Sequence, residues 1–164
     1  MAKYKKTAPT AIDFGAITGD IPEVKVSGDS FPFMPTRANG NNFDNGEGKE
    51  LIMHLFAVDS TMHEKAIAVM RLHQQAKMRK TGLKDVDDMT ETEIDAAIKS
   101  DEDSTCDYMA RMTSDWNIVH NGEPVPYSIE AGKQFYATAK TIRAECDSAM
   151  VNEGKERKKS LPGL

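Results

Sequence analysis

Residues 116–128 read Trp116-Asn117-Ile118-Val119-His120-Asn121-Gly122-Glu123-Pro124-Val125-Pro126-Tyr127-Ser128, and this run determines how the helical part of the chain is divided. Asn121-Gly122 is a strong signal for a two-residue turn, and each proline biases the residue before it away from helix. Ser128 is a favourable N-cap for a following helix. We therefore predict that Trp116 closes one helix and fills the core. Residues 123–126 should be extended, and another helix should begin at Ser128.

The same run is the candidate partner-binding site. In its simplest interpretation it only connects two helices, with Trp116 packed in the core. A rigid, extended Pro-Val-Pro element exposed between two helices would also lose little conformational entropy on binding. We therefore expect a partner to contact seven residues of this run, namely Trp116, Gly122, Glu123, Pro124, Val125, Pro126 and Tyr127.

After this run, apolar residues mark one face of a helix at steps of four, three, four and three: Phe135, Ala139, Ile142, Cys146 and Ala149. Such spacing is typical of one amphipathic helix, which we predict from Ser128 to about Asn152. Residues 153–164 are mostly polar, and we expect them to form a frayed tail.

Before this run, Thr90-Glu91-Thr92-Glu93 indicates a helix start. An apolar face follows through Ile94, Ile98, Tyr108 and Met112, but residues 100–104 interrupt it with polar side chains. One helix with a polar patch and two helices meeting at a short break both fit this pattern. We favour the break.

The most apolar run is Leu51-Ile52-Met53-His54-Leu55-Phe56-Ala57-Val58. It favours a buried strand, although a short core helix also fits the pattern. Thr61-Met62-His63-Glu64 has the form of a capping box, so we predict a helix to about Lys80, with Gly82 as its stop. The apolar face of this helix makes His73 a core residue, together with Met62, Ala66, Val69 and Ala76.

Charge is distributed unevenly between the two helical regions that follow the apolar run. Residues 61–80 carry five basic residues and one acidic residue, and residues 85–107 carry ten acidic residues and one basic residue. The predicted basic helix and acidic segment could therefore pack antiparallel and partly neutralise each other. Exposed ion pairs contribute only about 0–1 kcal/mol each.

The N-terminal region is rich in glycine and proline. Glu23-Val24-Lys25-Val26 alternates like a strand, whereas Phe31-Pro32-Phe33-Met34-Pro35 suits an extended arm better than a central strand, and residues 38–48 suit a loop. We predict a mainly α chain with a small β element, an α+β fold. It divides into an irregular arm with one or two short strands over residues 1–48, a helical core domain over 49–152 and the tail over 153–164.

Composition restricts the classes of function. The formal net charge of −5 disfavours a nucleic-acid-coating protein, and no apolar run approaches the length of a membrane span. Cys106 and Cys146 are expected to be reduced and buried. The four histidines lack helical metal-ligand spacing, and phosphate-loop and nucleophile motifs do not occur. We therefore expect no catalytic residues, no metal and no cofactor, and a protein that is not an enzyme.

The run Trp116 to Ser128 resembles the C-terminal part of small tailed-bacteriophage proteins grouped with the tail assembly chaperones. The resemblance rests on Trp116 and on Gly122-Glu123-Pro124-Val125-Pro126-Tyr127-Ser128. The apolar run ending at Asp59-Ser60, with an amphipathic basic helix after it, extends the likeness over about residues 50–150. The glycine- and proline-rich residues 1–48 depart from the shorter members of this group.

This resemblance implies a non-enzymatic protein that binds the phage tape-measure protein, prevents its apolar helices from aggregating and recruits tail-tube subunits. Such a protein would act in the host cytoplasm during assembly, with homo-oligomerisation left open. The long N-terminal region leaves a second interpretation, a structural virion protein of the tail, neck or capsid surface whose arm docks on a neighbour.

Overall fold

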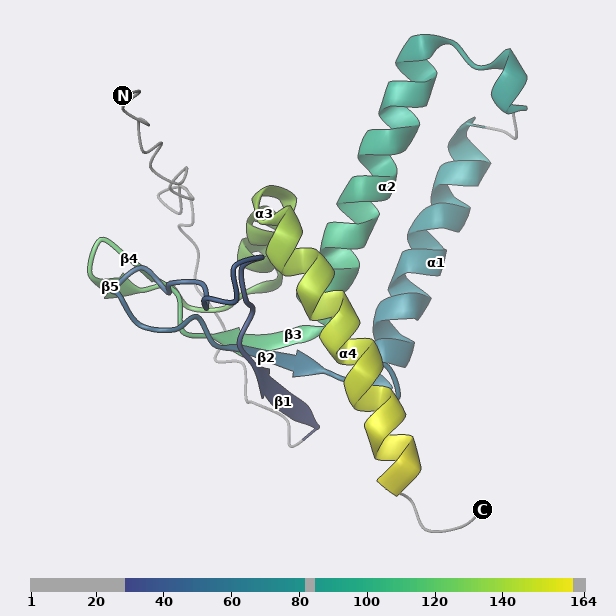
Figure 1. Cartoon of the computed structure of the whole chain (residues 1–164). Coiled ribbons are helices and arrows are strands. Elements are labelled where there is room, and N and C mark those ends of the chain that lie inside the picture. Colours follow the sequence, from purple (N-terminus) through teal and green to yellow (C-terminus); the bar gives the residue numbers. More distant parts are fainter. Residues whose placement is uncertain (1–28, 82–84, 161–164) are drawn as a thin grey trace.

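The computed structural model describes residues 29–81 and 85–160, and in them the chain is an α+β protein (Figure 1). Strands β1 (Ser30–Phe33), β2 (Met53–Phe56) and β3 (Thr113–Trp116) form one antiparallel sheet, and β4 (Val119–His120) pairs with β5 (Glu123–Pro124). The helices are α1 (Thr61–Thr81), α2 (Glu91–Arg111), α3 (Ile129–Thr138) and α4 (Lys140–Ser160), with a short 3₁₀ turn, η1 (Val86–Asp88), before α2. The predicted fold class is confirmed.

Strand β2 is the centre of the three-stranded sheet, as the most apolar run predicted. Phe31 lies opposite Leu55 on one side and His54 lies opposite Asp115 on the other. Its pairing with strands on both sides excludes the alternative of a short core helix, and Met53, Leu55 and Phe56 are all buried. The proline-containing β1 is an edge strand, the position in which a missing backbone N–H is tolerated.

Helices α3 and α4 and the base of α2 cover the sheet and enclose the core (Figure 1). The Cys146 thiol lies 3.7 Å from the Met53 sulfur, so α4 touches the central strand. The largest fully buried side chains are Met53, Leu55, Met109, Met112, Phe135, Tyr136 and Met150. Both cysteines are buried and unpaired, as predicted.

Helices α1 and α2 run antiparallel side by side and project away from the sheet (Figure 1). The predicted antiparallel packing of the basic and acidic regions is thus confirmed. Ser60 rather than Thr61 caps α1, because its Oγ accepts a hydrogen bond from the His63 N–H at 3.2 Å. At α2 the Thr90–Glu93 capping box forms as predicted. The expected stop at Gly82 lies outside the described residues.

Two helix boundaries differ from the predictions around residues 100–116. Helix α2 is continuous, without the break that we favoured, because the Ser104 and Thr105 hydroxyls bond carbonyls one turn earlier and Glu102 pairs with Lys140 of α4 at 2.8 Å. The polar patch is therefore satisfied on the helix. Trp116 does not close this helix. It ends strand β3.

The last helical region is two helices rather than one. The chain turns at Ala139, whose φ of −93° and ψ of 57° are not helical, and α4 then crosses the sheet in its own direction. The tail expected to fray beyond Asn152 is helical to Ser160. Gly154 is buried against Val58, and Arg157 pairs with Glu153 at 3.0 Å. These contacts hold the final turns in place.

The described part of the N-terminal region belongs to the packed domain, so the expected boundary at residue 48 does not separate an arm from a core. Strand β1 pairs with β2, and Phe31, Phe33 and Phe43 pack against the core. The predicted strand at residues 23–26 lies outside the described residues.

Candidate partner-binding surfaces

Two of the seven predicted contact residues are core anchors. Trp116 and Tyr127 are each only 6 % exposed, and their rings meet edge to face with centroids 4.9 Å apart. The Trp116 indole N–H donates to the Val125 carbonyl at 2.7 Å, and the Tyr127 hydroxyl donates to the Ala110 carbonyl. Their assignment to a contact surface is therefore corrected, because their polar groups are used to fix the segment on the domain.

The remaining predicted residues form an outward-facing strip on the β4–β5 hairpin. Asn121 and Gly122 have φ of 53° and 82°, the left-handed pair that a tight hairpin turn requires. Gly122, Glu123, Pro124 and Pro126 are exposed and Val125 is half-buried. The Val125 N–H donates to the Ile118 carbonyl at 2.8 Å, and the Val125 carbonyl accepts from the Trp116 indole. These two hydrogen bonds fix the extended conformation that the sequence predicts for this strip.

A polar brace that sequence reasoning missed supports this hairpin. The Asn45 amide donates to the Asn117 carbonyl at 3.0 Å, and the Asn117 Oδ1 accepts from the Ile52 N–H at 2.7 Å. The Val119 N–H donates to the Asn45 carbonyl at 2.7 Å. The loop over residues 38–48 is thus bound to the hairpin, and its Asn and Gly residues serve in turns and side-chain hydrogen bonds.

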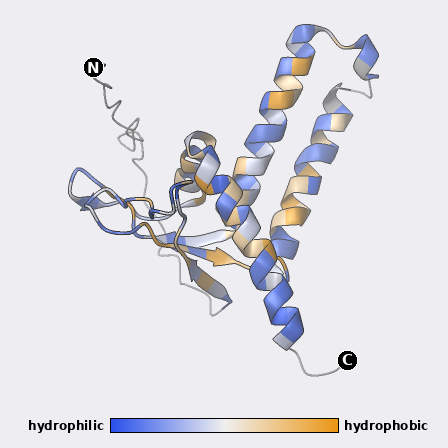
Figure 2. Cartoon of the chain, in the orientation of Figure 1, coloured by the Kyte–Doolittle hydropathy of each residue, from blue (hydrophilic) through white to orange (hydrophobic). Residues whose placement is uncertain are grey.

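The second surface is the outer half of the α1–α2 pair, which we call the distal hairpin and define as residues 71–79 and 91–104. Every residue from Arg71 to Arg79 is exposed, whereas Ala66, nearer the sheet, is buried. Four large apolar side chains of this region are in water: Leu72 at 62 %, Met78 at 51 %, Ile94 at 38 % and Ile98 at 61 % exposure. Figure 2 shows hydrophobic positions on the part of α2 that rises from the body.

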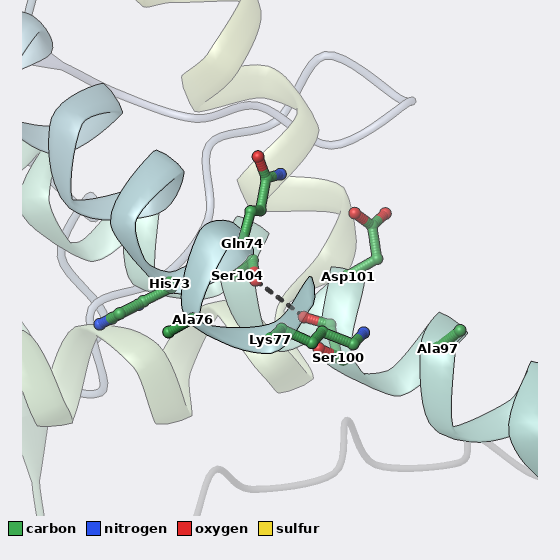
Figure 3. Close-up of a pocket in the computed structure, with 8 residues that line it drawn as sticks. All are labelled: His73, Gln74, Ala76, Lys77, Ala97, Ser100, Asp101 and Ser104. Atoms are coloured by element: carbon green, nitrogen blue, oxygen red, sulfur yellow. Dashed lines mark hydrogen bonds between the residues drawn. The ribbon is translucent and has the colours of Figure 1, made fainter. Parts of the chain in front are cut away.

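A groove of about 520 Å³ runs between the two helices of the distal hairpin (Figure 3). The small side chains Ala76, Ala97, Ser100 and Ser104 line it together with His73, Gln74, Lys77 and Asp101. His73 is exposed here, so the prediction that it is a core residue is wrong. The periodicity places His73 on the apolar face of α1 correctly. That face is exposed at His73 because this part of α1 projects away from the sheet.

The buried ionisable groups of the domain serve packing. Burial raises the pKa of the Cys146 thiol to about 12 and the pKa of the Tyr136 phenol well above its usual value. The Tyr136 hydroxyl lies 2.6 Å from the Thr113 hydroxyl. In residues 29–81 and 85–160 no group of three or more His, Cys, Asp or Glu side chains could hold a metal ion. No helix of this described part is long and apolar enough to cross a membrane.

A scan against protein-family models, a search of curated proteins and a search of solved structures each found no match. What this protein does must therefore be argued from its own residues and surfaces. Of the two surfaces, only the distal hairpin exposes several large apolar side chains on regular secondary structure.

Proposed function

We propose that this protein is a non-enzymatic tail assembly chaperone of a tailed bacteriophage, which binds the tape-measure protein and promotes assembly of the tail tube. The observation that supports this most directly is the exposure of Leu72, Met78, Ile94 and Ile98 on the distal hairpin. The resemblance of residues 116–128 to the tail assembly chaperones supports the phage context.

The exposed area has the magnitude expected for a reversible complex. The exposed fractions of the four side chains amount to roughly two whole side chains, and covering them would contribute about 3–6 kcal/mol. Association costs at least about 4 kcal/mol in lost translational and rotational freedom. The balance favours a client that binds at several sites and is released when assembly proceeds, which is how a chaperone differs from a permanent subunit.

The shape of the surface suits a helical client. An amphipathic helix recognises a partner through apolar residues that repeat every three or four positions and lie in a groove. The distal hairpin offers such a groove between two helices, with small side chains on its walls. A tape-measure protein, with long apolar helices, provides segments of this kind in many copies.

Co-expression with the tape-measure gene of the same genome tests the proposal. The client should become soluble with the wild-type protein and aggregate with the Ile94→Ser/Ile98→Ser variant. Ile129→Ser is the matched control, because Ile129 is an isoleucine exposed to a similar degree, 42 %, on α3. A client that stays insoluble with the wild-type protein would overturn the proposal, and so would full activity of the double variant.

Mass spectrometry of purified particles separates this proposal from a structural virion protein. A chaperone acting in the host cytoplasm should be missing from particles, and a structural protein should be present in many copies. An arm packed outside its own domain would favour the structural role, whereas in the described residues 29–48 strand β1 pairs with β2 and Phe31, Phe33 and Phe43 pack against the core of their own domain. The proposal therefore keeps the chaperone as the first candidate.

A further inference from the structure

We propose that the client segment bound by the distal hairpin is a basic amphipathic helix. Its apolar side chains pack on Met78 and Ile98, and its lysine or arginine side chains pair with carboxylates of α2. This inference rests on the proposed function, because it takes the distal hairpin to be the client-binding surface. It adds the charge of the client and the helix of the hairpin that contacts this charge.

Carboxylates surround the most exposed apolar side chain of α2. Ile98 is 61 % exposed. The residues three and four positions away lie beside it on the helix surface, and they are Ile94, Asp95, Asp101 and Glu102. Glu102 is already used within the domain, because it pairs with Lys140 of α4 at 2.8 Å. Asp95 and Asp101 are therefore the two acidic groups that flank Ile98 and face solvent.

These two carboxylates are available to a partner. Asp95 and Asp101 are both exposed, and among the residues that the structure describes neither carboxylate forms an ion pair. They lie six residues apart, which is about 9 Å along the helix axis. A partner helix that runs alongside α2 presents side chains two turns apart at about 11 Å. Two basic side chains of such a helix can therefore pair with both carboxylates, while an apolar residue between them contacts Ile98.

The α1 side of the same surface is apolar and adaptable. Met78 is 51 % exposed, and Figure 3 shows Gln74 and Asp101 pointing to the same side of the groove. Because Met78 follows Gln74 by four residues and Ile98 precedes Asp101 by three, Met78 and Ile98 share that side. A methionine is flexible enough to pack on apolar side chains of different shapes. The surface thus combines an adaptable apolar half on α1 with an acidic half on α2.

The basic residues of α1 leave this acidic half uncompensated. Lys77 lines the groove and has an interaction within the chain. Arg71 is about 10 Å from Met78 along the helix axis, and Arg79 points about 100° away from Met78 around α1. An acidic client would bring like charges against the α2 half, which disfavours its binding. A basic client is attracted to it, and the attraction also speeds the encounter.

The acidic surround is particular to Ile98 and is not found at every exposed apolar residue. Ile129 is 42 % exposed on α3, and its neighbours along that helix are Gly132 and Lys133. Leu72 is 62 % exposed on α1, and its neighbours are all uncharged, namely Ala68, Val69, Gln75 and Ala76. An exposed apolar side chain of this protein therefore does not need carboxylates beside it. Those beside Ile98 select what binds there.

An NMR titration of the isotope-labelled full chain with two synthetic helices tests the inference. Both peptides carry the same leucine stripe over about 20 residues, and the polar face is lysine in one and glutamate in the other. The lysine peptide should shift the amide signals of residues 73–78 and 95–101. It should bind at least about tenfold more tightly than the glutamate peptide. The preference should shrink in about 0.5 M salt, because exposed charges are then screened.

Substitutions on α2 assign the preference to its acidic half. Asp101→Asn should weaken binding of the lysine peptide about two- to fivefold. Asp103→Asn is the matched control and should bind like the wild type. It removes the same charge from an exposed residue that lies about 200° around α2 from Asp101. Asp95→Lys/Asp101→Lys should reverse the preference in favour of the glutamate peptide, and Ile98→Ser should weaken binding of both. Circular dichroism checks that every variant keeps its helices.

Three results would overturn the inference. The glutamate peptide could bind the wild type as tightly as the lysine peptide, neither peptide could bind, or the preference for lysine could survive in the Asp95→Lys/Asp101→Lys variant. Co-expression scores the proposed function separately. A tape-measure protein that becomes soluble while the glutamate peptide binds best would keep the proposed function and refute only the charge of the client. A lysine preference with an insoluble tape-measure protein would do the reverse.

Discussion

The substitution Gly154→Ala tests whether the C-terminal end of α4 is packed. Whether it raises or lowers the free energy of unfolding depends on that packing. In a frayed tail, Gly154→Ala would stabilise the protein by up to about 1 kcal/mol, because alanine is the better helix former. In the structure, an added Cβ would lie 2.7 Å from Cγ2 of Val58 and 3.6 Å from the Asp59 nitrogen. No real Cβ is found that close to a neighbour, so something must shift.

The cost of that shift decides the result. Overpacking a filled site costs about 1–3 kcal/mol, and Val58 cannot swing away freely because β-branched side chains are stiff at χ1. Set against the propensity gain, Gly154→Ala should lower the free energy of unfolding by about 0–2 kcal/mol. In a Val58→Ala background the Cγ2 atom that causes the clash is missing. There Gly154→Ala should raise the free energy of unfolding by about 1 kcal/mol.

Urea unfolding followed by circular dichroism and by Trp116 fluorescence measures the four free energies of this double-mutant cycle. The expected coupling between positions 58 and 154 is about 1–3 kcal/mol. Ala144→Gly, at an exposed position of the same helix, calibrates the propensity and should cost about 1 kcal/mol. If Gly154→Ala stabilised both backgrounds equally, the end of α4 would be frayed and the described packing wrong.

Three further predictions concern the core, the turn and the pH dependence. Tyr136→Phe should lower the free energy of unfolding by about 1 kcal/mol, because the buried Thr113 hydroxyl loses the hydrogen bond at 2.6 Å to Tyr136 and keeps only the one that it donates to the Met109 carbonyl. Gly122→Ala should cost about 1 kcal/mol at its φ of 82°, whereas Gly122→Asn should cost less. Burial raises the pKa of both Cys146 and Tyr108 to about 12, from 9.0 and 10.0. The folded protein holds these protons more tightly, so stability should fall as pH rises above 9.0, with a shallower fall for Cys146→Ala. Urea titrations above and below pH 9.0 measure this.

Local signals in the sequence predicted local structure correctly. The apolar run became the central strand, the Thr90–Glu93 capping box formed, and Asn121-Gly122 made the hairpin turn. Each of these depends on residues within a few positions of one another. Ser128 caps α3 for the same reason, since its Oγ accepts from the Ala131 N–H three residues later.

The errors arose where distant residues decide. Trp116 fits the spacing of the α2 face, but its pairing with Met53 places it on a strand. The polar residues 100–104 suggested a break in the helix. The ion-pair partner of Glu102, Lys140, lies almost forty residues further along the chain, so the local sequence does not show it. The turn at Ala139 likewise has no strong breaker in the sequence, and the two helices separated by it contact different parts of the domain.

The distal hairpin shows what a helical pattern does not predict, namely whether an apolar helix face is buried or exposed. Periodicity identified the apolar side of residues 61–80 correctly, but a period only says which residues share a face, not what covers that face. In the described residues, the part of α1 from Arg71 onward and the neighbouring part of α2 project away from the sheet (Figure 1). Met78, Ile94 and Ile98 are therefore exposed to solvent. A chain that keeps an apolar face beyond the reach of its own core has that face available for another polypeptide. The structure therefore adds a second candidate surface, a hairpin whose pattern resembled ordinary core, to the strip Gly122–Pro126, which stays a prediction, while Trp116 and Tyr127 anchor the domain.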